Sequence, residues 1–151
     1  MAFEEDTFLV MSADTTVRDP KVPLVRIMTR LMQTQPEVPG TVLVKGGSPV
    51  RLLAVIHDLN QDPSWKEEWI ASALRGIFEE SDRREVRSLA LPLLGTIHGR
   101  LERKCAVALL AKSLRQGPLQ RLRRLWLVVP SGSARGVIEI LESEYGKPTP
   151  Q

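Results

Sequence analysis

The feature that most constrains the fold is an alternation of short apolar runs with segments of helical periodicity. Strand-like runs occupy Thr7–Met11, Thr41–Lys45, Val50–His57, Val86–Leu91 and Leu125–Val129. Helical spacing fills the intervals, around Leu24–Leu31, after Asp62-Pro63-Ser64, over Leu101–Gln116 and from Ser131 or Ser133 to Tyr145. Strands separated by helices of this length predict an α/β fold. We expect three α/β/α layers around a mixed central sheet of about five strands.

Two local signals refine this prediction. Gly46-Gly47 between two strand-like runs is typical of a hairpin turn, which makes the sheet mixed. Ser64 followed by Glu67 fits a capping box at a helix start, although Pro63 could equally be the first helical residue. Trp65 and Trp69 share one face of this helix, and we expect core packing rather than a ligand platform.

Length and composition indicate one domain in 151 residues, with 42% hydrophobic and 26% charged residues. We expect a flexible N-terminus over 1–6, a single domain over 7–146 and a flexible tail over 147–151. The single cysteine, Cys105, excludes an internal disulfide and a cysteine-built zinc site, and its spacing places it on an apolar helix face. An acidic start and the lack of a long apolar run predict a cytoplasmic protein with no membrane contact.

Basic residues form three short clusters, around Arg84, Arg103 and Arg123, interleaved with Glu and Asp. Mixed signs are typical of solvated helix faces, and the formal net charge is only +3. Stacking of unpaired bases would need aromatic residues beside the arginines, and the chain has few. The sequence therefore does not favour a nucleic acid partner.

The loop after the fourth strand-like run is the strongest candidate site. It carries Gly95 and Gly99 and leads into a helix beginning near Leu101. Unpaired N–H groups ahead of a helix can receive an anion, and glycines let a phosphate approach the main chain. The candidate ligand-binding residues of this loop are Gly95, Thr96, Ile97, His98, Gly99 and Arg100. The same glycines could simply turn the chain.

Three segments resemble macro domains, which bind ADP-ribose and related nucleotides. Residues 92–96 (PLLGT) resemble the P-x-L-G-T-G loop of that family, residues 51–57 (RLLAVIH) its strand ending in V-I-H, and residues 40–44 (GTVLV) the strand before that. The resemblance covers most of the chain from Thr7, and it implies a reduced macro-like fold.

The departures from the family bear on activity. The I-V-N-A-A-N strand would fall on residues 9–14, which puts Met11 and Asp14 at the asparagine positions, and Ile97 replaces the last glycine of the loop. Asp14 is then a further candidate ligand-binding residue, as a reader of sugar hydroxyls, or it caps a turn. Hydrolysis of ADP-ribose is not expected, and we assign no catalytic residue, metal or cofactor.

Two histidines remain for chemistry. His98 in the loop could shuttle a proton, or it is a solvent-exposed loop residue; His57 at a strand end is interpreted as a structural histidine hydrogen-bonded beneath the site. The function that the sequence favours is a non-catalytic macro-like module that binds an ADP-ribose, nucleotide or phosphate ligand through 92–100. The alternative is a degenerate macro-like module that binds a protein partner and no small molecule.

Overall fold

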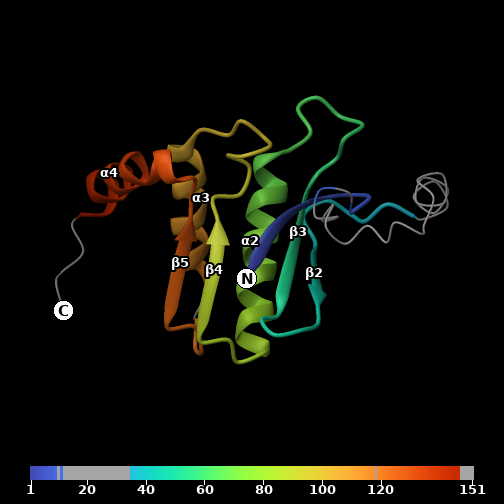
Figure 1. Cartoon of the computed structure of the whole chain (residues 1–151), viewed down its shortest axis with the longest axis horizontal. Helices are drawn as coiled ribbons and strands as arrows, with labels where there is room; N and C mark the ends of the chain where they lie inside the picture. The colour runs from blue at the N-terminus through green and yellow to red at the C-terminus, as the bar shows by residue number, and fades with distance from the viewer. Residues whose placement is uncertain (10, 12–34, 118, 147–151) are drawn as a thin grey trace.

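The computed structural model describes residues 1–9, 11, 35–117 and 119–146. Within these residues the chain forms five strands, three α-helices and one short 3₁₀ helix. In chain order the elements are β1 (Ala2–Asp6), β2 (Val42–Lys45), β3 (Arg51–His57), α2 (Glu67–Arg83), β4 (Ser88–Pro92), α3 (Arg103–Gln116), β5 (Arg124–Val128), η2 (Ser131–Ser133) and α4 (Ala134–Tyr145) (Figure 1).

The strands form two hydrogen-bonded groups that lie side by side. β3 is the central strand of the first group, parallel to β1 and antiparallel to β2. β4 and β5 pair in parallel in the second group, with Ser88 opposite Arg124 and Pro92 opposite Val128. β1 lies next to β4 (Figure 1). The α/β fold with mixed strand directions and the hairpin at Gly46-Gly47 are confirmed.

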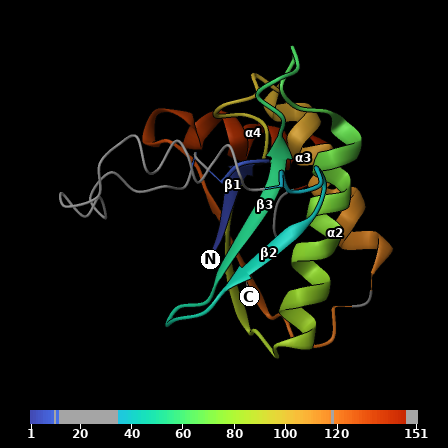
Figure 2. The ribbon, with the colours of Figure 1, turned by 90° about the vertical axis from the view of Figure 1, so that its right-hand side faces the viewer.

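The core lies between the strands and two helices. α2 and α3 lie next to each other on one face of the strands (Figure 2). α2 buries Ala73, Leu74 and Ile77, as its helical periodicity predicts, and Ile70 in addition. β3 is buried along its whole length after Arg51, as expected of a strand at the centre of its sheet. Cys105 is partly buried against this core, as predicted.

The first strand was predicted in the wrong place. β1 spans Ala2–Asp6, and Thr7 and Phe8 form a turn rather than a strand. Residues 1–6 are therefore not a flexible terminus. The prediction was based on the apolar run TFLVM. It missed β1 because this buried strand carries three acidic residues and so lacks an apolar pattern. The helix predicted around Leu24–Leu31 and the tail 147–151 lie outside the described residues.

The start of α2 also differs from the prediction. The helix begins at Glu67, and Ser64 does not cap it. The Ser64 hydroxyl is instead hydrogen-bonded to the His57 ring. Trp65 precedes the helix and is half-buried against the core, which confirms its partial packing. Trp69 is also half-buried, but it is not among the described residues that pack against the core. In the part of the chain that the structure describes, no helix has the length and apolar character required to cross a membrane.

Asp82, at the end of α2, holds the segment that leads into β5. Its carboxylate accepts hydrogen bonds from the backbone N–H groups of Arg121 (3.0 Å) and Gln120 (3.1 Å), which hold the pKa of Asp82 below its ordinary value. A carboxyl with a depressed pKa stabilises the fold above its unfolded pKa, near 4, and this contribution is lost as the pH falls through the folded pKa.

We therefore expect Asp82→Asn to lower the free energy of unfolding at pH 7 and to flatten its decline below about pH 4. Urea unfolding from pH 7 to pH 2.5 measures both effects. Glu139→Gln is the control, because Glu139 is exposed and bonded only to Arg135 of its own helix among the described residues. Equal pH profiles for Asp82→Asn and the unmodified protein would contradict the prediction.

Candidate functional site

The loop between β4 and α3 is closed at its base. Leu101 donates its backbone N–H to the carbonyl oxygen of Gly95 at 2.9 Å, so residues 96–100 project as a compact loop. Thr96 binds back to the carbonyl of Leu93 through both its N–H (3.2 Å) and its hydroxyl (2.7 Å). The sequence prediction of a turn-forming loop ahead of α3 is confirmed, although the helix begins at Arg103.

Packing explains both glycines of the loop. Gly95 has a φ of +84°, and a Cβ there would lie 2.6 Å from Cδ1 of Ile70. A Cβ on Gly99 would lie 2.6 Å from Cδ1 of Trp65 and 2.7 Å from the Gly95 carbonyl oxygen. No side chain fits at these distances, so each glycine is required by its protein neighbours. The sequence interpretation, in which the glycines make room for a phosphate, is not needed to explain them.

The backbone N–H groups of the loop divide into two sets. Gly95 donates its N–H to Oε1 of Glu4 at 2.6 Å, and Thr96 donates to Leu93. The N–H groups of Ile97, His98, Gly99 and Arg100 have no hydrogen-bond partner among the described residues. The predicted cradle is therefore only partly available, because a carboxylate of the protein already occupies its first amide.

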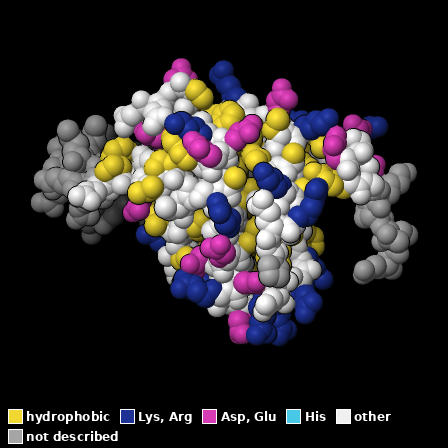
Figure 3. All heavy atoms as spheres, turned by 180° about the vertical axis from the view of Figure 1, so that it is seen from behind, with side chains coloured by type: hydrophobic (Ala, Val, Ile, Leu, Met, Phe, Trp, Pro, Cys, Tyr) yellow, Lys and Arg dark blue, Asp and Glu magenta, His cyan; other side chains and the backbone are white. Residues whose placement is uncertain are grey.

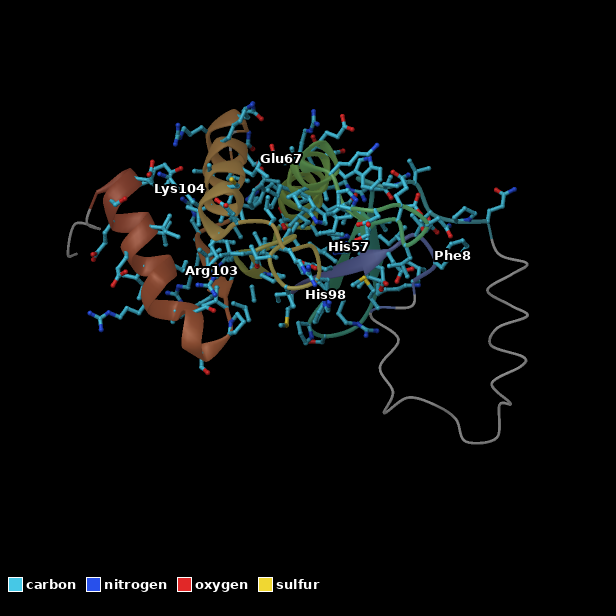
Figure 4. All side chains as sticks on the ribbon, turned by 90° about the horizontal axis from the view of Figure 1, so that it is seen from above. Phe8, His57, Glu67, His98, Arg103 and Lys104 are labelled. Carbon is cyan, nitrogen blue, oxygen red and sulfur yellow. The ribbon has the colours of Figure 1, made fainter. Side chains whose placement is uncertain are left out.

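Glu4 belongs to a chain of buried polar groups beneath the loop. Its Oε2 lies 3.1 Å from Nε2 of His57, and Nδ1 of His57 lies 3.0 Å from the Ser64 hydroxyl. His57 is fully buried, and Glu4 is 8% exposed. His57 is thus hydrogen-bonded beneath the site, as interpreted from the sequence. His98 is exposed, with its ring edge-on to that of His57 at 6.1 Å between centroids (Figure 4).

The role of Glu4 was missed in the sequence. Within β1, Ala2, Glu4 and Asp6 alternate with Phe3 and Glu5, which gives no hydrophobic periodicity. Nothing local marks Glu4 as a partner of a loop 91 residues further along the chain. The pairing of β1 with β3 brings the Glu4 carboxylate to His57, and the position of β1 next to β4 brings it to Gly95.

The end of β1 is strongly acidic and buried. Glu5 accepts hydrogen bonds from the N–H groups of Asp6 and Met11, while Asp6 accepts from Phe8 and Met11. Glu5 and Asp6 are fully buried. These hydrogen bonds tie both carboxylates to the turn that follows β1.

The opposite side of the loop is basic and open. A shallow cavity of about 470 Å³ lies where the loop meets α3 and α4, and it is lined by Thr96, Arg100, Leu101, Glu102, Arg103, Lys104 and Ile140. No acidic residue lies in the first turn of α3, so its N-terminal N–H groups and the helix dipole favour an anion. Thr96 and Arg100 are the predicted site residues that line this cavity.

Arg103 and Lys104 are the cavity residues that the sequence analysis assigned to a solvated helix face. Nη2 of Arg103 donates to the Ser133 hydroxyl at 2.8 Å, which fixes the guanidinium at the cavity (Figure 4). Lys104 lies 3.0 Å from Oε1 of Glu144, and this hydrogen bond raises the pKa of Lys104. The exposed Arg100 has no ion-pair partner among the described residues. The first turn of α3 and the loop before it thus bring three cations together.

Asp14 lies outside the described residues. No group of three or more His, Cys, Asp or Glu side chains in the described ranges is arranged to hold a metal ion.

No family model matches the sequence, and no curated protein matches it. Solved structures do match. The macro domain of ganglioside induced differentiation associated protein 2 is 10% identical with a TM-score of 0.66, over 95% of this chain and 75% of that one. A point mutant of the Oceanobacillus iheyensis macrodomain is 16% identical with a TM-score of 0.65, over 94% of this chain and 82% of that one. The chain has a divergent macrodomain fold. At these identities the likeness establishes the fold alone.

Within this macro-like fold, one strand assignment is wrong. The strand that precedes the hairpin and pairs in parallel with the V-I-H strand is Ala2–Asp6, whereas the resemblance placed it on residues 9–14. Met11 follows the turn and donates its N–H to Glu5 and Asp6. The basis for placing Met11 and Asp14 at the family's asparagine positions is therefore lost.

Proposed function

We propose that this macro-like protein is a non-catalytic module that binds a nucleotide-type ligand, such as ADP-ribose or ADP, with a phosphate on the basic side of the 95–101 loop. One observation carries the proposal. The four N–H groups of residues 97–100 have no partner among the described residues, and the loop adjoins a cavity lined by Arg100, Arg103 and Lys104. The O. iheyensis macrodomain has been solved with ADP (17% identity, TM-score 0.57, 79% of this chain and 66% of that one).

The side chains on this side of the loop suit a phosphate. Hydrogen bonds between a phosphate and guanidinium groups are charge-assisted and shorter and stronger than neutral ones. Arg103 is held in place by Ser133, so binding costs little additional ordering of its side chain. The Thr96 hydroxyl is committed to Leu93, and it therefore shapes the cavity rather than binding the ligand.

We expect Arg100→Ala and Arg103→Ala each to weaken binding of ADP-ribose by about tenfold or more, the cost of losing one charged hydrogen-bond partner. Isothermal titration with ADP-ribose, ADP and inorganic phosphate measures the dissociation constants. Arg135→Ala is the matched control, because it removes the same charge from a side chain that is 93% exposed on α4. Dissociation constants that do not change in Arg100→Ala and Arg103→Ala would contradict the proposed site. Recovery of a hydrolysed ligand would contradict the proposal that the module is non-catalytic.

A second function, a protein-interaction module without a small-molecule ligand, is favoured by a different observation. Glu4 already takes the Gly95 amide, and the branched Ile97 side chain is 51% exposed where the family has glycine. If the native protein binds none of the three titrated ligands, this alternative replaces the first.

A further inference from the structure

A second basic cavity lies at the opposite end of β4 and β5 from the 95–101 loop. Its volume is about 430 Å³, and it is lined by Glu85, Arg87, Gln120, Arg121 and Arg123. Arg87 and Arg123 directly precede the two strands. Because side chains alternate along a strand, Arg87 lies on the same face as Leu89, which is buried in the core beneath the helices. Lys and Arg side chains gather at this lower end of the molecule (Figure 3).

Hydrogen bonds hold the backbone around this cavity. The carbonyl oxygen of Arg87 accepts the N–H groups of Arg123 (2.9 Å) and Arg124 (3.1 Å), which ties the starts of β4 and β5 together. The Asp82 carboxylate, at the end of α2, accepts the N–H groups of residues 120 and 121 at 3.1 and 3.0 Å. A ligand that enters the cavity therefore meets backbone segments that are already fixed, so its binding costs little ordering of the main chain.

The charges that line the cavity do not balance. Its acidic side chain, Glu85, pairs with Arg121 at 3.3 Å. Arg87 and Arg123 are exposed and form no ion pair with any residue that the structure describes. Two guanidinium groups of one cavity thus remain available to an anionic ligand, and a third is restrained by a single carboxylate.

The cations beside the cavity do not extend its free positive charge. Arg83 and Arg84, at the end of α2, both pair with Glu80, at 2.6 and 3.3 Å. Arg124 lies on the opposite face of its strand, with its guanidinium 5.5 Å from the centre of the Trp126 ring. Single-stranded nucleic acid is held along a positively charged groove that follows its backbone. Free cations confined to one concavity suit a compact anion instead.

Glu85 has an uncommon backbone conformation at the edge of this cavity. Its φ is +56°, in the left-handed region that side chains other than those of Asn and Asp rarely adopt. The turn is closed by its N–H, which donates to Asp82 at 3.0 Å, and by the N–H of Val86, which donates to Ser81 at 2.8 Å. Non-glycine residues in such conformations cluster at ligand sites and switch regions. Here the turn places the Glu85 carboxylate against Arg121.

We infer that this cavity binds a small molecule that carries two linked phosphate groups, and that Glu85 competes with this ligand for Arg121. Guanidinium groups bind phosphate oxygens through paired, charge-assisted hydrogen bonds, and three of them around one concavity match the charge of a diphosphate. The volume lies within the usual range of small-molecule sites, about 300–1,000 Å³. The site is separate from the 95–101 loop and goes beyond the function proposed above.

The first test is isothermal titration of the whole chain with pyrophosphate at constant ionic strength. We expect Arg87→Ala and Arg123→Ala each to weaken binding about tenfold, the loss of one charged partner. Glu85→Gly should strengthen binding because it frees Arg121, and thermal unfolding should show no loss of stability because glycine readily adopts a positive φ. Arg135→Ala is the charge-matched control and should leave the affinity unchanged, since this arginine is exposed on α4.

The second test locates the ligand by amide chemical shifts. Pyrophosphate should shift the amide signals of residues 85–87 and 120–123, and it should still do so in Arg103→Ala, which removes a cation of the loop site. Three results would overturn the inference: no binding of pyrophosphate, shifts confined to residues 95–101, or an affinity that Glu85→Gly does not raise. Sulfate that binds as tightly as pyrophosphate would contradict a site for two phosphates. A single-stranded oligonucleotide that displaces pyrophosphate at lower concentration would assign the surface to nucleic acid instead.

Discussion

Replacing His57 with alanine is expected to lower the free energy of unfolding by about 3–5 kcal/mol. The ring is fully buried and hydrogen-bonded at both nitrogens, to Glu4 and to Ser64. Removing the ring leaves a cavity. It also deprives the buried Glu4 carboxylate of one of its two hydrogen-bond partners, the other being the Gly95 N–H. The change in the urea midpoint, with the slope of the transition, measures the effect.

Two variants separate this explanation from a general sensitivity of the region. His98→Ala removes the neighbouring exposed ring and should change the free energy of unfolding by about 0.5 kcal/mol or less. Glu4→Gln keeps an oxygen for the Gly95 amide and offers an NH₂ group to His57, so it should cost less than His57→Ala. If His57→Ala proves as mild as His98→Ala, the buried chain of hydrogen bonds does not stabilise the fold.

Replacing Gly95 with valine is expected to cost about 2–5 kcal/mol of stability. A φ of +84° is unfavourable for any L side chain by about 1–2 kcal/mol and is worse for a branched one. The added Cβ would also lie 2.6 Å from Cδ1 of Ile70 and 3.3 Å from Cβ of Leu101, and overpacking of a filled core costs about 1–3 kcal/mol. Urea unfolding checks the value.

Gly46→Val is the matched control for this substitution. Gly46 is free of steric neighbours within 4 Å among the described residues, and its φ lies outside the left-handed region. Its replacement should therefore change stability little, while Gly95→Val also disrupts the loop and any ligand binding there. A Gly95→Val protein as stable as Gly46→Val would mean that the loop adjusts freely, and the rigid geometry described for it would be wrong.

The sequence predicted the elements whose residues interact locally. The hairpin over Gly46-Gly47, the apolar stripe of α2 and the order of strands and helices from 41 onward follow from periodicity and turn chemistry, which are properties of neighbouring residues. Ser64 shows where this reasoning fails: a hydroxyl with the spacing of a helix cap is instead hydrogen-bonded to His57, the last residue of the preceding strand β3. β1 shows it again, because its acidic residues find their partners elsewhere in the fold.

The candidate site divides in the same way. Residues 92–100 alone were enough to identify the glycine-bearing loop ahead of α3 and its likeness to macro domains. The backbone conformation of a turn depends on the types of the adjacent residues that form it. The sequence could not decide which amides of that loop remain available, since Gly95 donates to a carboxylate 91 residues away. It also could not decide that Arg103 faces a cavity or that Arg124 lies against Trp126. Charge and hydrogen bonding act through space, so only the tertiary structure determines which charges are compensated and which remain for a ligand.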